Sequence, residues 1–364
     1  MGVPVELEIR QSYDNPVGTD GIPFIEFSAI DPKPIANVLT QSGFEEIAKH
    51  RTRSITFWRQ GNIDVLLNND PSTYGYGFAE RHGPCISAIS FRVADVELGR
   101  DRAIENGIVV YDGDRGELPV DTLAMDGIGH SLLYLMTPEQ EGRIKADEFV
   151  PHQDSSLREV AGAGFFEIDH LTHNVMEGNM NRWADFYRNA FNFREVFYLD
   201  TKGEKTGLRT RAMKSPCNRI CIPVNEPTDK ESQVQEYIDQ YKGEGVQHLA
   251  FLSDDLNASI EQIAGNGIPF MNIPDSYYAG IEDRMPGHGQ DVQRLRTNGI
   301  LIDGDREPDG KWGILLQLFS KNLIGPIFFE FIQRKGNDGF GNNNAKALFE
   351  AIERDQIERG VVRK

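Results

Sequence analysis

Three side chains in the second half of the sequence are of the types that bind a catalytic metal ion. His170 lies in the run FEIDHLTHNV, His248 in GVQHLAF, and Glu330 in IFFEFIQ. Each run is largely apolar and has the length of a buried strand, where an imidazole or a carboxylate is costly unless a partner satisfies it. Two histidines and one carboxylate are the ligands of a facial triad, which leaves open positions on Fe(II), whereas zinc favours a tetrahedral site.

A third histidine in these runs, His173, competes with His170 for a place in such a site. Side chains two residues apart share one face of a strand, so His170 lies on the same face as Ile168 and Thr172. By the same alternation, His173 points the other way or begins the following loop. Any one of these side chains alone would more often be a hydrogen-bonded structural residue. It is the combination of three separate runs that predicts a metal site.

The elements that must position these side chains recur along the chain. In the first half we expect strands over residues 22–30, 54–60, 63–69, 86–93 and 131–136, with helices over 32–43 and 95–107. In the second half we expect strands over residues 165–175, 194–200, 218–224, 246–252, 313–319 and 327–333, with helices over 180–192 and 255–267. Between the halves, the polar residues 137–163 are typical of a linker and a surface segment.

One internal repeat aligns without a gap. Residues 89–108, ISFRVADVELGRDRAIENGI, match residues 249–268, LAFLSDDLNASIEQIAGNGI, as strand, turn, helix and a helix-ending Asn-Gly pair. The repeat predicts an α+β protein built from duplicated βαβββ modules, with two curved sheets of about eight strands each. We place the two domains at residues 1–150 and 151–364. Because Ala88 aligns with His248, and Tyr134 falls near the place of Glu330, we expect metal in the second domain only.

Composition limits the classes of partner. The formal net charge is −18 and the acidic residues are spread along the chain, which argues against nucleic acid and anionic membranes as partners. No run of apolar residues is long enough to span a membrane, and the first residues lack the pattern of a secretory signal. Three cysteines without a CxxC motif suggest neither a disulfide framework nor a thiolate zinc site. We therefore expect a cytoplasmic protein.

Six motifs in order make the sequence recognisable. They are IDHLTHNV (168–175), IPVNEP (222–227), GEGVQHLAF (243–251), LLQLFSK (315–321), FFEFIQRKG (328–336) and GFG (339–341). With these motifs the chain resembles the 4-hydroxyphenylpyruvate dioxygenase family of the vicinal-oxygen-chelate superfamily, from about residue 20 to the C-terminus. The resemblance implies open, barrel-like mixed sheets with helices outside and a C-terminal lid helix. It also implies one Fe(II) per chain, bound by His170, His248 and Glu330, with His173 outside the ligand set.

The resemblance further implies a substrate pocket and a reaction. Matching pocket positions are Thr210, Asn225, Gln233, Gln317, Phe319, Phe328 and Phe340. No catalytic residue is implied beyond the metal ligands. The implied reaction converts 4-hydroxyphenylpyruvate, an aromatic 2-oxo acid, and O₂ into homogentisate and CO₂, in the catabolism of tyrosine and phenylalanine. Members of the family are usually homodimers or homotetramers.

One position departs from the family pattern. After GFG the family commonly has a phenylalanine where this chain has Ala345, so a lid aromatic is missing unless Phe349 takes its place in space. This departure keeps a second reaction open, the synthesis of 4-hydroxymandelate from the same substrate. Two more distant alternatives are an extradiol ring-cleaving dioxygenase, which needs a further catalytic histidine and tyrosine, and a catalytically inactive binding protein of the same fold.

Overall fold

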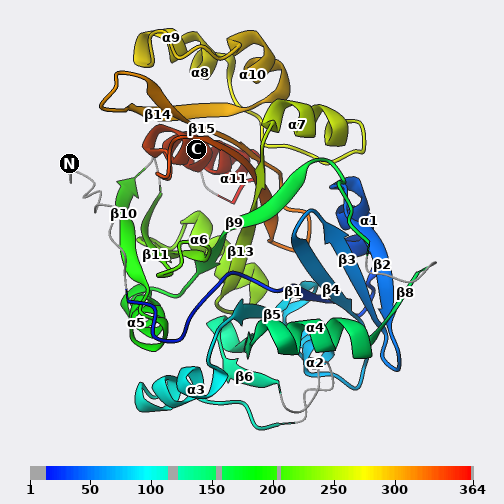
Figure 1. Ribbon diagram of the computed structural model, residues 1–364. Helices are drawn as coiled ribbons and strands as arrows, with labels where there is room; N and C mark the ends of the chain where they lie inside the picture. The colour runs from blue at the N-terminus through cyan, green and yellow to red at the C-terminus, as the bar shows by residue number, and fades with distance from the viewer. Residues whose placement is uncertain (1–13, 114–121, 153–157, 203–205, 362–364) are drawn as a thin grey trace.

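Two eight-stranded mixed sheets form the framework of the molecule in the computed structural model, which describes residues 14–113, 122–152, 158–202 and 206–361 (Figure 1). The first sheet contains β1 (Ile25–Ser28), β2 (Glu45–His50), β3 (Ile55–Gln60), β4 (Ile63–Asn68), β5 (Cys85–Arg92), β6 (Leu123–Asp126), β7 (Leu132–Met136) and β8 (Phe149–Pro151). Its strands lie in the order β6-β7-β5-β1-β4-β3-β2-β8.

The second sheet repeats this plan. It contains β9 (Phe165–Asn174), β10 (Arg194–Lys202), β11 (Gly207–Lys214), β12 (Cys221–Pro227), β13 (Gly245–Ser253), β14 (Leu301–Arg306), β15 (Trp312–Phe319) and β16 (Phe328–Lys335). The order is β10-β11-β12-β9-β13-β16-β15-β14, so β9 and β13 occupy the centre and β16 is next to them. The predicted α+β fold with two sheets of about eight strands is confirmed.

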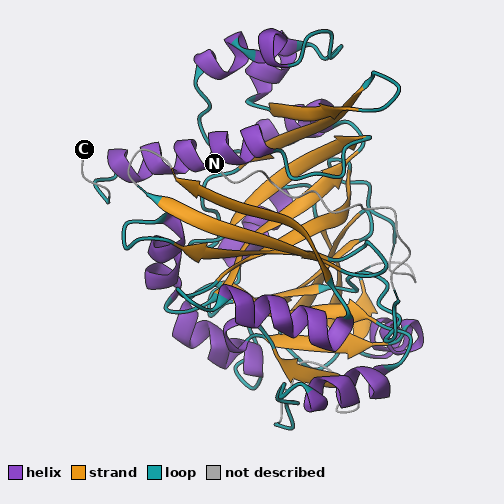
Figure 2. Ribbon diagram, turned by 90° about the vertical axis from the view of Figure 1, so that its left-hand side faces the viewer, coloured by secondary structure: helices purple, strands orange, loops and turns teal. Residues whose placement is uncertain are grey.

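Helices lie on the outside of the sheets, and one helix closes the second sheet (Figure 2). The helices are α1 (Lys33–Gln41), α2 (Tyr74–His82), α3 (Val96–Glu105), α4 (Pro138–Asp147), α5 (Met180–Phe191), α6 (Gln233–Tyr241), α7 (Leu256–Ala264), α8 (Asp275–Ala279), α9 (Ile281–Arg284), α10 (Val292–Asn298) and α11 (Asn342–Glu358), with a short 3₁₀ helix at Ile128–His130. The C-terminal helix α11 packs against β14 and α6. No helix among the described residues is long and apolar enough to cross a bilayer.

The internal repeat is visible in the caps of matching helices. Asp95 caps α3 by accepting a hydrogen bond from a backbone N–H, and Asp255 caps α7 in the same way. After each helix a glycine adopts a left-handed conformation, with φ +73° at Gly107 and +93° at Gly267. The two halves also share a core, in which Phe91 of β5 packs against Phe191 and Phe193. The helices of the two copies therefore begin and end with the same kinds of capping residue.

The segment predicted as a linker is more ordered than its composition suggests. Residues 137–163 include α4 and β8, so the prediction of a linker and surface segment alone was wrong. Thr137 and Gln140 form a reciprocal capping box, and Pro138 begins the helix. Polar residues dominate α4 because only a narrow side of it, with Ile144, is buried. The domain boundary at residue 150 stays a prediction.

Candidate metal centre

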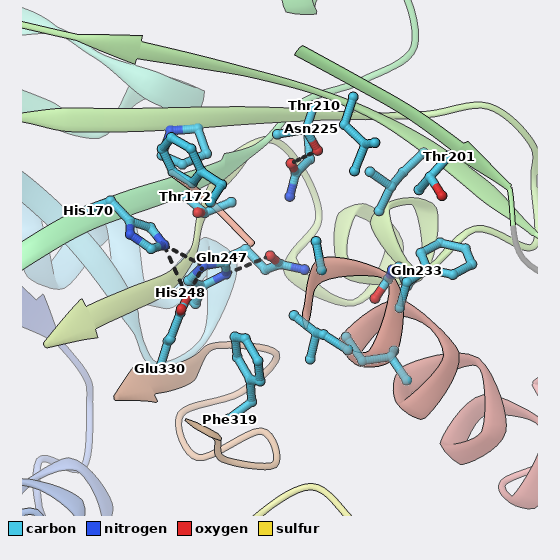
Figure 3. Close-up of a pocket in the computed structure, with 18 of the residues that line it drawn as sticks. His170, Thr172, Thr201, Thr210, Asn225, Gln233, Gln247, His248, Phe319 and Glu330 are labelled. Carbon is cyan, nitrogen blue, oxygen red and sulfur yellow. Dashed lines mark hydrogen bonds and ion pairs between the residues drawn. The ribbon is translucent and has the colours of Figure 1, made fainter. Parts of the chain in front are cut away.

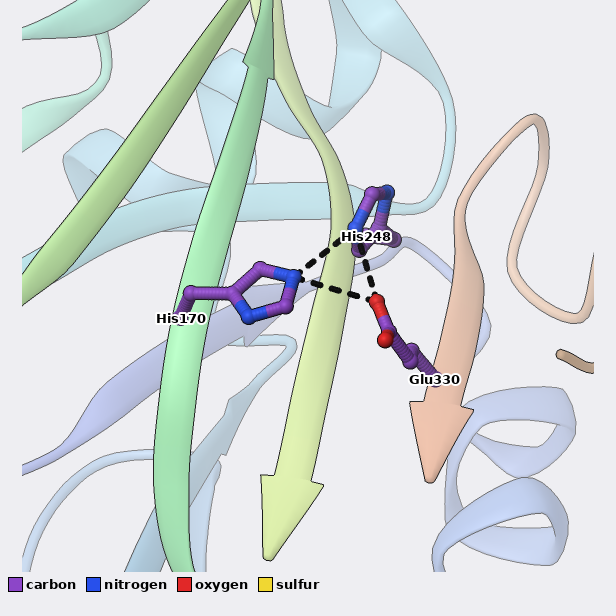
Figure 4. A group of neighbouring side chains, drawn as sticks. All are labelled: His170, His248 and Glu330. Carbon is purple, nitrogen blue, oxygen red and sulfur yellow. Dashed lines mark hydrogen bonds and ion pairs between the residues drawn. The ribbon is translucent and has the colours of Figure 1, made fainter. Parts of the chain in front are cut away.

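The three predicted ligands converge on one face of three neighbouring strands (Figure 4). In the strand register, His170 of β9 lies opposite Ala250 of β13, and Ala250 lies beside Glu330 of β16. His248 is two residues before Ala250 on the central strand, so it shares the same face. Because the Ala250 side chain is small, the space over this part of the sheet is free for the side chains of His170, His248 and Glu330. The strand register therefore explains how three residues far apart in the sequence come together.

The distances between the three side chains are short. Glu330 Oε2 lies 3.0 Å from His170 Nε2 and 3.3 Å from His248 Nε2, and the two Nε2 atoms are 3.3 Å apart. All three residues are buried, with at most 6% of their surface exposed. Such a cluster of two imidazoles and one carboxylate fits a divalent cation, because a cation offsets the cost of burying the charge.

Each imidazole is oriented by the residue that precedes it in the sequence. His170 Nδ1 lies 2.7 Å from Asp169 Oδ2, and His248 Nδ1 lies 2.9 Å from Gln247 Oε1. An N–H at Nδ1 that donates to these oxygens leaves Nε2 as the basic atom that faces the site. Sequence reasoning did not identify Asp169 or Gln247, although the pairs Asp-His and Gln-His were visible in the motifs.

Glu330 is held from a different strand. Gln317 of β15 donates a hydrogen bond of 2.7 Å from Nε2 to Glu330 Oε1, which leaves Oε2 directed at the histidines. Burial alone would raise the pKa of Glu330, but His170 and His248 lower it to about 2. For His170, burial alone would lower the pKa, but Glu330 and Asp169 raise it to about 9. A metal ion and a proton therefore compete for His170 Nε2.

The triad lies at one end of a cavity with an empty volume of about 720 Å³, including its open mouth (Figure 3). All seven predicted substrate-binding residues line this cavity: Thr210, Asn225, Gln233, Gln317, Phe319, Phe328 and Phe340. Pro223 of the IPVNEP motif also lines the cavity, and further walls, which the sequence did not reveal, come from Thr172, Phe197, Leu199, Thr201, Leu208 and Gln247. These residues belong to β9–β13, β15, β16, α6 and the loop before α11, which explains why no single motif contains them.

Some polar side chains in the cavity already have hydrogen-bond partners within the protein, and others do not. Thr210 donates to Asn225 Oδ1 at 2.7 Å, whereas Gln233 Oε1 is buried and has no partner among the described residues. Both ends of the Gln317 amide are bonded, to Glu330 and to Asn344. Gln317 thus orients Glu330, one of the predicted metal ligands. Gln233 Oε1 remains available to accept a hydrogen bond from a substrate.

Helix α11 covers the cavity with one stripe of side chains. Ala345, Leu348, Phe349 and Ile352 follow the spacing i, i+3, i+4 and i+7 and all line the cavity. Phe349 is only 3% exposed and lies one turn after Ala345. The aromatic side chain that α11 contributes to the cavity is therefore Phe349. At Ala345, one turn earlier, only a methyl group faces the cavity.

His173 lies outside the cluster. It is fully buried on the other face of β9, where its Nε2 lies 2.7 Å from the hydroxyl of Tyr187. Burial lowers the pKa of His173 to about 3, so it is neutral at physiological pH. The choice of His170 over His173 from strand alternation is consistent with this placement.

The first sheet has no comparable set of side chains at the matching place. The repeat matches Ser90 with Ala250, and Tyr134 lies beside Ser90 as Glu330 lies beside Ala250. Phe24 takes the place of His170, since its backbone N–H and C=O both bond to the Ser90 hydroxyl. Phe24, Ala88 and Tyr134 are all buried in one apolar cluster. This triplet offers one phenol oxygen and no imidazole or carboxylate.

Comparisons with known proteins agree with this geometry. Residues 13–147 match the family model described as hydroxyphenylpyruvate dioxygenase, N-terminal, and residues 167–284 match the glyoxalase/bleomycin resistance protein/dioxygenase superfamily. A 4-hydroxyphenylpyruvate dioxygenase from Pseudomonas sp. (strain P.J. 874) is 45% identical over 96% of this chain and 98% of its own length. Hemolysin VllY from Vibrio vulnificus is 44% identical over the same shares.

A solved structure shares the fold. A triple mutant of 4-hydroxymandelate synthase from Streptomyces coelicolor superimposes with a TM-score of 0.79 at 26% identity, covering 93% of this chain and 99% of that one. The two sheets and the buried triad agree with the fold of this structure, and the family model over residues 13–147 and the relative at 45% identity indicate the family.

Proposed function

Because the chain belongs to the 4-hydroxyphenylpyruvate dioxygenase family, we propose that it converts 4-hydroxyphenylpyruvate and O₂ into homogentisate and CO₂. The observation that carries the proposal is the buried cluster of His170, His248 and Glu330 at the end of a cavity lined by all seven expected pocket residues. We further propose that the reaction belongs to the catabolism of tyrosine and phenylalanine, as the resemblance to the family implies. The active form is a homodimer or homotetramer.

The three side chains would hold one Fe(II) per chain. Two imidazoles and one carboxylate suit a six-coordinate Fe(II) with positions left for exogenous ligands better than they suit structural zinc. When bound, this ion would supply the site where the 2-oxo acid chelates and O₂ is activated. The protein contributes the fixed orientation of the ligands through Asp169, Gln247 and Gln317.

The cavity determines how the substrate lies. The triad is at one end and Gln233 at the other, near α11 (Figure 3). With the keto acid directed at the triad, the phenol hydroxyl points toward Gln233, whose unpartnered Oε1 accepts its hydrogen bond. Phe319, Phe328 and Phe340 enclose the ring, and the apolar stripe of α11 excludes water.

A second candidate reaction is the formation of 4-hydroxymandelate from the same substrate. The likeness to a 4-hydroxymandelate synthase and the small Ala345 in the cavity wall support keeping it. The extradiol alternative has less support, because the cavity lining within the described residues contains no tyrosine and no histidine besides His170 and His248.

Product analysis separates these reactions. We expect the purified protein, supplied with Fe(II), O₂ and 4-hydroxyphenylpyruvate, to form homogentisate as the main product, because relatives that are 44% and 45% identical over 96% of this chain are 4-hydroxyphenylpyruvate dioxygenases. Chromatography and mass spectrometry against authentic standards identify the product. 4-Hydroxymandelate as the main product would replace the proposed reaction with the second candidate, and turnover of catechols without CO₂ release would point to extradiol cleavage.

A further inference from the structure

A first chain of polar contacts leads from His170 to the residues just before α11. Asp169, which accepts the Nδ1–H of His170, forms a two-pronged ion pair with Arg334, at 2.6 Å from Nε and 2.8 Å from Nη2. The remaining Nη1 of Arg334 donates to the backbone oxygens of Asn337 at 3.1 Å and Gly339 at 2.6 Å. Every nitrogen of this guanidinium is therefore engaged, either on the carboxylate behind the histidine or on the loop before α11.

A second chain leads from Glu330 to the first turn of α11. Gln317 donates from Nε2 to Glu330 and accepts at Oε1 from Asn344 Nδ2, at 2.8 Å. An ionised carboxylate can only accept, so it fixes the orientation of the Gln317 amide, and that amide in turn fixes the orientation of Asn344. Gln317 and Asn344 are buried, so a broken link would leave a polar group unsatisfied.

Both chains end on the same short segment, residues 337–344. Within it, the Phe340 ring lies edge-on to the His170 ring, with centroids 5.8 Å apart. Gly341 has φ +68°, and a Cβ at this position would lie 2.9 Å from Gln317 Oε1. The start of α11 is therefore built directly against side chains that touch two of the three predicted metal ligands.

The other end of α11 is attached elsewhere. Arg359 pairs with Glu236 of α6 at 2.5 Å, and Gln356 donates to Glu236 at 2.9 Å. These contacts do not reach the metal cluster. Within the described part of α11, the polar contacts that lead to the predicted ligands come from its first turn and from the loop before it.

We propose that Arg334 and Asn344 are positioning residues that couple metal binding at the triad to the placement of α11 over the cavity. The proposal rests on the metal centre proposed above and adds a consequence to it. If a fixed ligand geometry favours the ordered start of α11, then metal binding stabilises that segment, and by linkage the ordered segment strengthens metal binding. Metal binding thereby orders the helix that covers the substrate cavity.

Metal affinity gives the first test. Fe(II) is titrated anaerobically into metal-free protein without substrate. Arg334→Lys keeps a positive charge beside Asp169 but loses the two-pronged pair and the loop contacts, and we expect about 10-fold weaker binding or more. Asn344→Ala removes the bond to Gln317 and also the acceptor of the Tyr277 hydroxyl. Because only the bond to Gln317 leads to the triad, we expect Fe(II) binding to weaken about fivefold, as for one lost buried hydrogen bond.

Two control variants separate the coupling from a general loosening of α11. Asn343→Ala removes a side-chain hydrogen bond of the same helical turn, from Nδ2 to Asp303 at 2.9 Å, that does not lead to the triad. Arg359→Gln removes the ion pair between the far end of the helix and Glu236, although the hydrogen bond from Gln356 to Glu236 remains. We expect both control variants to bind Fe(II) as the wild type does.

Hydrogen exchange gives an independent readout. Fe(II) should slow amide exchange of residues 337–350 in the wild type and in Arg359→Gln, and this protection should be reduced in Arg334→Lys and Asn344→Ala. If the wild type binds Fe(II) while exchange in this segment does not change, or if all four variants bind with wild-type affinity, the coupling is refuted and the metal centre stands. A wild type that binds no metal would overturn the metal centre and the coupling with it.

Discussion

Replacing Glu330 with glutamine is expected to weaken Fe(II) binding by more than about 100-fold, beyond the loss typical of residues that only touch a ligand. Glu330 is the only anion of the triad, and without its charge a divalent cation would be buried between two neutral imidazoles. Glutamine preserves the volume of the side chain, so the effect is that of the charge. We expect turnover of 4-hydroxyphenylpyruvate to fall by more than about 1000-fold, since the chemistry depends on the metal.

A second buried glutamate of the same sheet supplies the matched control. Glu226 of β12 is 5% exposed, against 2% for Glu330, and bonds to backbone N–H groups of Gly178 and Met180. Glu226→Gln therefore removes a buried charge without touching the triad, and it should retain metal content and O₂ uptake. Metal analysis and oxygen-electrode rates of both variants give the comparison. Wild-type iron content and turnover in Glu330→Gln would remove Glu330 from the ligand set.

Enlarging Ala250 is expected to have the second largest effect. This residue is fully buried between His170 and Glu330 in the strand register, and its small side chain lies beneath the converging ligands. Leucine at this position would occupy the space in which the three ligand atoms meet. We expect Ala250→Leu to lose metal binding and turnover to about the same extent as Glu330→Gln, with a loss of stability of about 1–3 kcal/mol from overpacking.

The duplicated fold provides the control for this substitution. Ala88 in β5 is buried at the place that His248 occupies in β13, within the apolar cluster of the first sheet. Ala88→Leu should cost comparable stability but leave Fe(II) binding and turnover intact. Thermal unfolding measures the first quantity and metal titration the second. Equal metal binding by Ala250→Leu and the wild type would show that the ion lies elsewhere.

The triad was predictable from the sequence because its strands are apolar and long, so a histidine or glutamate within them is conspicuous. The internal repeat supplied the comparison with Ala88, and the structure confirms that this strand and the helix after it recur with the same caps. Strand alternation also separated His170 from His173, which the structure places on opposite faces of β9.

Other parts of the site could not be predicted, because they depend on contacts between distant segments. The link from Asn344 to Gln317 joins residues 27 apart, and Arg334 reaches Asp169 across 165 residues. Strands such as β11 and β14 carry many polar residues, so apolar patterning did not identify them. Helix α4 was missed for the same reason. Side chains of this kind are placed by tertiary packing rather than by local propensity.

The most direct test of the central claim is O₂ uptake by the purified protein with 4-hydroxyphenylpyruvate, with and without Fe(II). We predict uptake that depends on both, with one CO₂ released for each O₂ consumed, and no uptake after the protein has been stripped of metal. Uptake should return when Fe(II) is added back and should not return with Zn²⁺. Absence of uptake in the iron-loaded protein, or full uptake by Glu330→Gln, would contradict the assignment of His170, His248 and Glu330 as an iron site for this reaction.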